Sequence, residues 1–176
     1  MAHRALTGVL LVGGASARFG SPKALAEHGG RTLAEQAWVT LDFCAERVAV
    51  GKAVDGLDLP FPVLDDGTDT RAPIAGVVAA LRIASHEISV ILPVDTPRVD
   101  AAALEELADA CADAAVPQTG PLPGAYRRSA LPVLERNLAA GELSLRRALD
   151  QLESRVVRID PDLLANANTP DDLARL

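Results

Sequence analysis

An apolar run that leads directly into a glycine-rich loop is the feature that most constrains the fold of this chain. Residues 9–12 are apolar throughout, which predicts a buried strand. Gly13 and Gly14 follow at once, and because glycine has no side chain, their backbone N–H groups can face a ligand closely. Arg18 and Lys23 then supply positive charge. This order of strand, glycines and cations predicts a phosphate-binding loop.

The spacing of the glycines disfavours two commoner phosphate loops. Gly13, Gly14 and Gly20 do not form the dinucleotide pattern G-x-G-x-x-G. Lys23 does not follow its glycine directly, as it does in the P-loop pattern G-x-x-x-x-G-K-[ST]. A hydride-transferring enzyme and a P-loop ATPase are therefore disfavoured. A plainer interpretation is that the glycines form only a turn and that Arg18 is a solvated surface charge.

Length, composition and charge restrict the class of protein. A chain of 176 residues with 49% hydrophobic content has the size of one domain with a full core. Aromatic residues make up only 3%, so the core must consist of Leu, Val, Ile and Ala, which suits parallel strands covered by helices. The net charge of -7, without a stripe of Lys or Arg, argues against binding to nucleic acid or a membrane surface. Any anionic ligand must therefore be met by local groups.

The cysteines and the apolar segments carry no sign of a metal site or a membrane anchor. Cys44 and Cys111 stand far apart, each inside a predicted helix and without a nearby histidine, so we expect buried free thiols. The sequence shows no charged start followed by a long apolar region and no run of about 18 apolar residues. We therefore expect a cytoplasmic protein without a signal peptide or a membrane span.

Predicted strands alternate with predicted helices. Strands are expected at residues 6–12, 47–51, 62–64 and 88–93. Helices rich in Ala and Leu are expected at residues 32–44, 73–84 and 101–112. The alternation is typical of an α/β fold, and it predicts a three-layer, Rossmann-like, mostly parallel sheet with helices on both faces.

Several predicted helices carry a signal for their first residue. Thr32 and Glu35 have the spacing of a capping box, and Pro73 stands at a favourable position in the first turn. Near the carboxyl end of the chain, Thr169 and Pro170 have the order of an N-cap followed by the first helical residue. These signals place helix starts close to the ends of predicted strands.

The chain divides into two parts of one domain. Residues 1–113 contain the phosphate loop and the regular alternation, so we assign them to nucleotide binding. Residues 114–176 begin with a segment rich in Pro and Gly, followed by helices at 129–140 and 144–152 and a strand at 155–159. We interpret this second part as an elaboration on which a second substrate docks.

Asp95 is the candidate metal ligand. It leaves the carboxyl end of the predicted strand at 88–94, and ligands of open α/β sheets bind beyond these strand ends. The same rule brings the Gly13 loop and Asn168 toward one crevice with it. A single carboxylate suffices for Mg²⁺, which completes its shell with water and substrate phosphates. Alternatively, Asp95 caps a helix that begins near Arg98.

These motifs resemble those of the molybdenum cofactor guanylyltransferases. Residues 11–23 match the signature L-x-G-G-x-S-x-R-x-G-x-x-K, and Val-Asp-Thr-Pro around Asp95 is similar to the D-x-P metal loop of the family. Residues 72–76 are similar to its G-P-L-A-G segment, and residues 166–170 to its terminal N-x-N-T-P. The resemblance therefore covers nearly the whole chain and implies a fold of the nucleotide-diphospho-sugar transferase type.

The resemblance implies a reaction and a set of site residues. The reaction is transfer of GMP from GTP to molybdopterin, or to its metal-loaded form, with release of pyrophosphate and formation of molybdopterin guanine dinucleotide. Mg²⁺ on Asp95 is the implied cofactor, and Lys23, Arg18 and Asp95 are the implied catalytic residues. Molybdenum-insertion and cofactor-carrying proteins are implied as partners. The implied nucleotide-binding residues are Leu11, Val12, Gly13, Gly14, Ser16, Lys23, Gly51, Asp66 and Asp95.

Departures from the family pattern leave alternatives open. Gly51 stands where many members carry an asparagine on the guanine side, so a CTP-dependent molybdopterin cytidylyltransferase, or a relative that acts on another phosphorylated cofactor or sugar, stays open. The acceptor loop is compressed to residues 120–124. Arg127 and Arg128 either hold an anionic acceptor or form a surface pair that opens a helix.

Arg146 and Arg147 are weaker candidates for an acceptor contact than Arg127 and Arg128. An alternative of another class is a non-catalytic nucleotide-binding module, which the joint presence of Lys23 and Asp95 disfavours.

Overall fold

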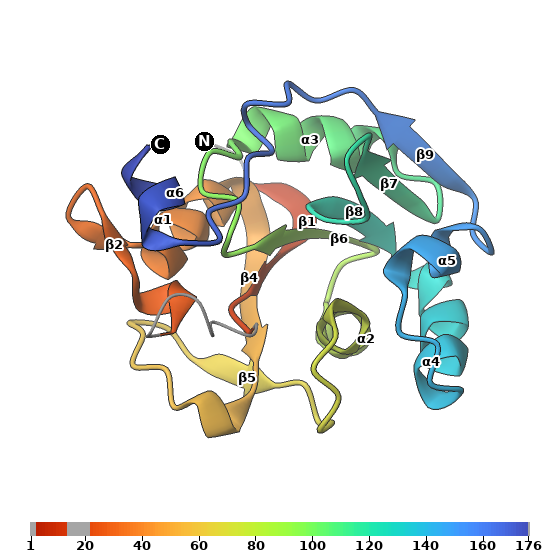
Figure 1. The fold of residues 1–176 in the computed structure, drawn as a ribbon. Coiled ribbons are helices and arrows are strands. Elements are labelled where there is room, and N and C mark those ends of the chain that lie inside the picture. Colours follow the sequence, from red (N-terminus) through yellow and green to blue (C-terminus); the bar gives the residue numbers. More distant parts are fainter. Residues whose placement is uncertain (1–2, 14–21, 176) are drawn as a thin grey trace.

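A seven-stranded sheet with the strand order β5-β4-β1-β6-β8-β7-β9 forms the centre of the fold (Figure 1). The computed structural model describes residues 3–13 and 22–175. The sheet contains β1 (Arg4–Leu11), β4 (Cys44–Gly51), β5 (Val63–Asp65), β6 (Ile88–Pro93), β7 (Ala114–Pro117), β8 (Gly124–Arg127) and β9 (Ser154–Val157). Within this sheet β8 runs antiparallel to both of its neighbours, whereas the other pairs are parallel. The predicted mostly parallel sheet is therefore confirmed.

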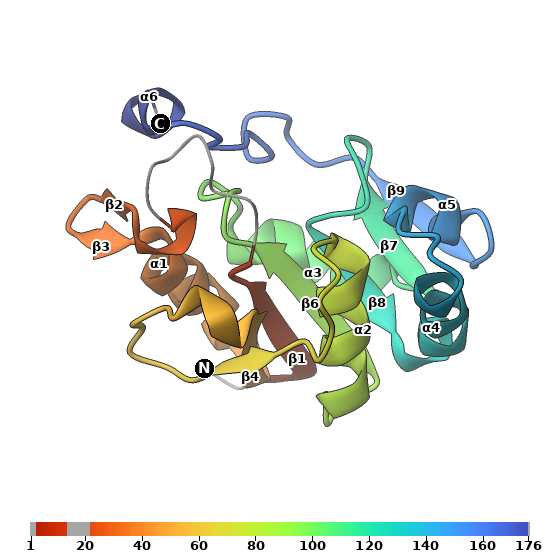
Figure 2. The same cartoon turned by 60° about the horizontal axis from the view of Figure 1, so that its bottom comes forward.

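Helices cover both faces of this sheet, as Figure 2 shows for α2 in front and α3 behind. The helices are α1 (Leu33–Thr40), α2 (Pro73–Ile83), α3 (Ala101–Ala110), α4 (Leu131–Ala139), α5 (Leu145–Leu149) and α6 (Pro170–Ala174). Successive side chains of a strand point to opposite faces, so Leu10 joins the core cluster under α1 and α3, and Leu11 joins the cluster under α2 and α4. The three predicted layers are present.

The predicted helix starts are confirmed by their hydrogen bonds. The Glu35 backbone N–H donates to Thr32 Oγ1 at 3.1 Å, and the Thr32 backbone N–H donates to Glu35 Oε2 at 2.8 Å. Thr169 caps α6 by accepting from the backbone N–H of Asp172 at 3.1 Å, with Pro170 as the first helical residue. None of the helices among the described residues is long and apolar enough to cross a membrane.

Some predicted elements were wrong in extent or kind. The helix expected at 32–44 ends at Thr40, a 3₁₀ turn (Leu41–Phe43) follows, and Cys44 is the first residue of β4. The segment rich in Pro and Gly contains β7 and β8, which sequence patterns missed because each strand has four residues and lies beside prolines. Short elements outside the main sheet are the hairpin β2 (Glu27–His28) and β3 (Arg31–Thr32) and the 3₁₀ turns Lys23–Leu25, Ala53–Asp55 and Arg128–Ala130.

The strand order creates the position of the site. From β1 the chain builds outward through β4 and β5 on one side, and it then returns to place β6 on the other side of β1. Ligands of open α/β sheets bind at such a reversal of strand order. Leu11 lies opposite Pro93 in the ladder between β1 and β6, and the Val94 backbone N–H donates to Leu11 O at 3.1 Å. Gly13 and Asp95 therefore leave neighbouring strands at the same edge.

The buried thiols allow the packing of the core to be tested by their reactivity. Both cysteines are free and buried, as predicted, although Cys111 follows α3 rather than lying inside it. Burial raises the pKa of the Cys44 thiol to about 12 and that of Cys111 to about 11. Because the thiolate is the reactive form, we expect native protein to react with Ellman's reagent at pH 8 at least about a hundredfold more slowly than urea-unfolded protein. Rapid titration of the thiols in the native state would contradict this packing.

Candidate functional site

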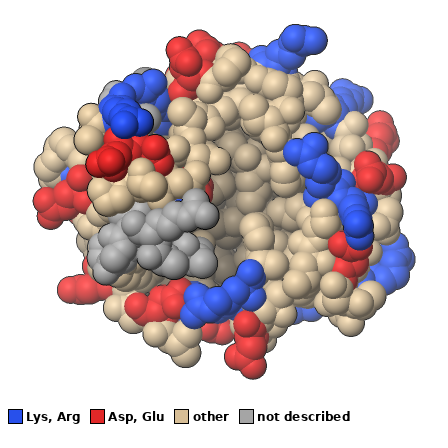
Figure 3. Space-filling model, viewed as in Figure 1, with Lys and Arg blue, Asp and Glu red and all other residues tan. Residues whose placement is uncertain are grey.

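A cavity of about 770 Å³ opens beyond the carboxyl ends of β1, β4 and β6. Its size lies in the range of small-molecule sites. Figure 3 shows a hollow with a mostly uncharged floor and with Lys or Arg side chains on its rim. The carboxyl-terminal half contributes residues 119–122, 143–146 and part of the segment 164–168 to the lining. Both halves of the chain therefore meet at one site.

Lys23, Asp95 and Asn168 come together in this cavity from three distant parts of the chain. Lys23 Nζ lies 3.5 Å from Asp95 Oδ2 and donates a hydrogen bond to Asn168 Oδ1 at 3.1 Å. The Ala167 backbone N–H donates to Asp95 O at 2.8 Å, which ties the carboxyl-terminal segment to the loop after β6. The Lys23 and Asp95 side chains are 15% and 32% exposed, so both are accessible from the cavity. The predicted crevice around these residues is present.

Asp95 does not cap the following helix. The side chain of Asp100 fills that role, since its Oδ1 accepts from the Ala103 backbone N–H at 2.9 Å. The turn after β6 is closed instead by Thr96, whose Oγ1 donates to Pro93 O at 3.0 Å. The alternative interpretation of Asp95 as a helix cap is therefore wrong, and its carboxylate lines the cavity.

The donor set at Asp95 fits a magnesium ion that arrives with a substrate. Among residues 3–13 and 22–175, no three His, Cys, Asp or Glu side chains gather as a metal site would require. Asp95 nevertheless offers a partly exposed carboxylate, which is a hard oxygen donor. Mg²⁺ commonly binds one or two carboxylates together with water and substrate phosphates. A single protein ligand is thus sufficient for this ion.

The described part of the phosphate loop lines the cavity. Leu11, Val12 and Gly13 lie at its wall, where β1 ends. The Val12 backbone N–H donates to Val50 O at 3.0 Å, which holds the start of the loop against β4. The predicted site residues Gly14, Ser16 and Arg18 lie outside the described residues. The placement of Gly13 follows directly from the pairing of β1 with both of its neighbours.

Gly51 is a glycine because β1 and β4 approach each other closely at this point. A Cβ atom added to Gly51 would lie 2.8 Å from Cγ2 of Val12, which is too short for a carbon contact. The carbonyl of Gly51 accepts from the Asp66 backbone N–H at 3.0 Å. Position 51 therefore contributes backbone alone to the cavity, and a side chain there would force Val12 to shift.

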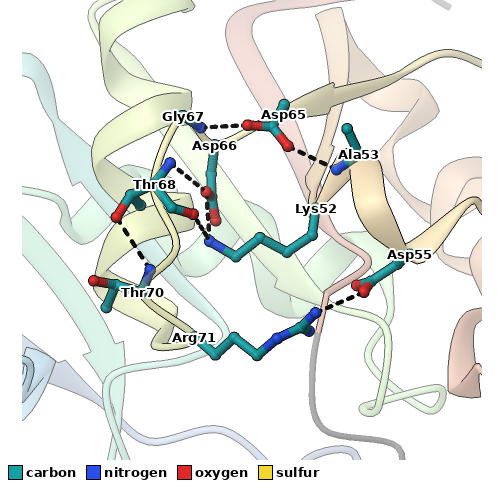
Figure 4. Close-up of polar contacts among 9 residues, drawn as sticks. All are labelled: Lys52, Ala53, Asp55, Asp65, Asp66, Gly67, Thr68, Thr70 and Arg71. Carbon is teal, nitrogen blue, oxygen red and sulfur yellow. Dashed lines mark hydrogen bonds and ion pairs between the residues drawn. The ribbon is translucent and has the colours of Figure 1, made fainter.

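Lys52 and Asp66 form a buried ion pair beside Gly51 (Figure 4). Lys52 Nζ donates to Asp66 Oδ1 at 2.6 Å and also to Thr68 O, and both ion-pair side chains are less than 10% exposed. Asp66 was predicted from the sequence and Lys52 was missed, although a cation directly after the end of β4 was a usable signal. Asp66 thus faces the cavity with its charge already compensated.

The neighbouring acidic residues shape the turn. Hydrogen bonds from the backbone N–H groups of Ala53 and Gly67 lower the pKa of Asp65 below its ordinary value. Through these bonds Asp65 fixes the turn that follows β5. Arg71 lines the cavity and donates to Asp55 Oδ1 at 2.9 Å, a hydrogen bond that raises the pKa of Arg71 (Figure 4).

Arg127 and Arg128 lie outside the cavity lining and bind backbone instead. Arg127 Nε donates to Ala112 O at 2.8 Å, and Arg128 Nη2 donates to Ala84 O. These contacts favour a structural role for the two arginines over acceptor binding. The pair anchors the loops at the end of β6 and β8 that lies away from the cavity. Arg146, the weaker candidate from the sequence, is the arginine of this half that lines the cavity in the described structure.

Comparison with known proteins gives a consistent result. The sequence model of the family described as MobA-like NTP transferase domain matches residues 8–156. The chain is 31% identical, over 97% of its length and 94% of the relative's, to a molybdenum cofactor guanylyltransferase from Desulfosudis oleivorans. It superposes with a TM-score of 0.81 and 28% identity on molybdopterin-guanine dinucleotide biosynthesis protein A from Archaeoglobus fulgidus, covering 96% of this chain and 95% of that one. A 2-C-methyl-D-erythritol 4-phosphate cytidylyltransferase from Thermus thermophilus shares the fold, with a TM-score of 0.75, 21% identity and 95% coverage of each chain.

The buried pair gives the first prediction at this site. Lys52→Met leaves the Asp66 carboxylate buried without its cation, so we expect the free energy of unfolding in urea to fall by about 3 kcal/mol. The double variant Lys52→Met, Asp66→Asn removes both charges and should recover much of that loss. A single variant within about 0.5 kcal/mol of the parent would show that the pair carries little of the local stability.

The close approach at Gly51 gives a second prediction. Gly51→Ala should lower the free energy of unfolding by about 1–3 kcal/mol, because the new Cβ overlaps a methyl group of Val12. In a Val12→Ala background the same change should cost at least about 0.5 kcal/mol less. Gly13→Ala is the matched control, since its Cβ would meet Gly51 Cα at an ordinary 3.6 Å. Strictly additive losses would contradict the proposed overlap.

Proposed function

The chain belongs to the MobA-like NTP transferase domain family, and we propose that it transfers GMP from GTP to the terminal phosphate of molybdopterin. The products are molybdopterin guanine dinucleotide and pyrophosphate. The family resemblance inferred from the motifs is confirmed by the comparisons. The observation that carries the proposal is that Lys23 and Asp95 face each other in one cavity at the end of the phosphate-loop strand.

The proposed reaction is an in-line displacement at the α-phosphorus of the nucleotide. An oxygen of the acceptor phosphate forms a new P–O bond, and the bond between the α-phosphorus and the bridging oxygen breaks, so pyrophosphate leaves with the electron pair. A phosphomonoester is largely dianionic at neutral pH, since its second pKa is about 6. The attacking group therefore needs no general base, and repulsion between two anions is the main obstacle.

The residues of the cavity supply positive charge against that repulsion. The ammonium group of Lys23 has contacts to both Asp95 and Asn168, which hold it at the edge where β1 and β6 end. There it is suited to bind the phosphates of the nucleotide, together with the backbone at Gly13. A magnesium ion held by Asp95 and by the phosphates would add Lewis-acid neutralisation of the same charge.

The base would lie against the wall formed by the ends of β4 and β5. Gly51 offers only backbone there, while Lys52 and Asp66 offer a donor and an acceptor within the same wall. The missing side chain at Gly51 keeps a CTP-dependent cytidylyltransferase as the second candidate. The shared fold of the cytidylyltransferase from Thermus thermophilus supports keeping that candidate.

A nucleotide panel separates these activities. Pyrophosphate release is measured from GTP, CTP, ATP and UTP, each with and without molybdopterin, and we expect GTP with molybdopterin to be fastest. Preference for CTP would replace the guanylyltransferase with the cytidylyltransferase. Tight GTP binding without pyrophosphate release would instead indicate the non-catalytic module. The cytoplasmic location stays a prediction from the apolar pattern of the sequence, and the molybdenum-insertion and cofactor-carrying partners stay predictions of the family resemblance.

Asp95 gives the test of the catalytic assignment. Asp95→Asn removes the metal-binding charge, so we expect kcat to fall by at least about a hundredfold, in line with the loss of one preorganised electrostatic contact. The urea midpoint should stay unchanged, because this side chain caps no helix. Asp69→Asn, an exposed carboxylate outside the cavity, is the control and should keep the full rate. Near-normal turnover of Asp95→Asn would remove the metal assignment.

A further inference from the structure

The cations that line the cavity differ in the partners that the fold gives them. Among the described residues, three of these cations have a carboxylate within ion-pair distance. These pairs are Lys23 with Asp95 at 3.5 Å, Lys52 with Asp66 at 2.6 Å and Arg71 with Asp55 at 2.9 Å. The charge of each of these cations is therefore balanced, at least in part, by the protein itself.

Arg146 is different. Its Nη2 donates to a neutral carbonyl, Thr119 O, at 3.3 Å. Across residues 3–13 and 22–175, no carboxylate lies within 4.0 Å of its guanidinium nitrogens. In a chain with a net charge of -7, a cavity cation without a carboxylate partner is an uncompensated local charge. Such a charge attracts an anion into this part of the cavity.

The fold places Arg146 on the acceptor side of the cavity. It belongs to α5, which Leu145 and Ala148 anchor in the core under β7 and β8, while the Arg146 side chain itself is exposed. Its guanidinium lies against the backbone of Gly120, where an added Cβ would come within 3.7 Å of Nη2. Figures 1 and 2 both show α5 on the opposite side of β6 from α1, which follows the Lys23 turn in the chain. The positive charge of Arg146 thus faces the nucleotide wall from the other half of the protein.

We propose that Arg146 binds the phosphomonoester of the acceptor and orients it for attack on the nucleotide. This assignment rests on the proposed function, which brings a second phosphate into the cavity. A guanidinium offers parallel N–H donors that match two oxygens of a phosphate, which leaves the third oxygen to attack. Lys23 and the backbone of the phosphate loop serve the nucleotide on the other wall, so the two anions are met by separate cations.

Arg147 provides a matched control on the same helix. Its Nη1 donates to Glu142 Oε2 at 2.7 Å, its side chain is 73% exposed, and it does not belong to the cavity lining. The two arginines are neighbours on one helix and carry the same charge. They differ in whether the guanidinium reaches the cavity.

The experiment compares Arg146→Gln with Arg147→Gln. The Kd for molybdopterin is measured by pterin fluorescence with a non-hydrolysable GTP analogue present, the Kd for GTP is measured without acceptor, and KM and kcat come from pyrophosphate release. For Arg146→Gln we expect the Kd and KM for molybdopterin to rise at least about tenfold, with the Kd for GTP within twofold of the parent. Arg147→Gln should leave every value within about twofold. Arg146→Lys should recover part of the loss, because it restores the charge without the fork.

The outcomes separate this inference from the proposed function. If the parent protein turns over molybdopterin and Arg146→Gln leaves its Kd and KM unchanged, the assignment of Arg146 is overturned and the proposed function stands. An equal weakening of GTP binding would place Arg146 on the nucleotide and overturn the assignment as well. If the parent binds GTP but neither binds nor converts molybdopterin, the proposed function fails, and the assignment fails with it.

Discussion

The parallel pairing of β1 with β6 is the interaction on which the site depends. Because Leu11 lies opposite Pro93 in that ladder, the chain leaves both strands at the same level. Gly13 and Asp95 then emerge side by side, on the two arms of a strand order that reverses between β1 and β6. A shift of this register by one residue would turn the side chains of one strand to the opposite face. The burial of Leu10 and Leu11 in separate clusters strongly opposes such a shift.

The carboxyl-terminal half of the chain completes the site that forms at the ends of the parallel strands. The bond from the Ala167 N–H to Asp95 O brings Asn168 within reach of Lys23, so a segment more than 140 positions along the chain helps to hold the lysine. On the opposite wall, α5 brings Arg146 to the cavity. The site is therefore a junction between the two halves of the chain, each of which contributes cations to the cavity.

Local signals such as helix caps were the features of the structure that the sequence predicted best. The capping box at Thr32 and the N-cap at Thr169 depend on residues that are close in the chain, so the sequence alone predicts them, and the structure contains both. The strands β7 and β8 escaped prediction because four-residue strands beside prolines look like loop, and their pairing is decided by distant partners. Lys52 was overlooked for a related reason, because its ion-pair partner Asp66 lies in a different loop, directly after β5.

The sequence by itself determined the class of fold and the family, because these depend on short spacings and on the alternation of apolar segments. Only the tertiary structure decided which charged side chains share a cavity. The sequence left open whether Arg127 and Arg128 bind an acceptor, but in the structure they bind backbone carbonyls, whereas Arg146 lines the cavity. The physical reason is that a helix or loop motif specifies its own backbone, while the direction of a long side chain depends on the elements packed around it.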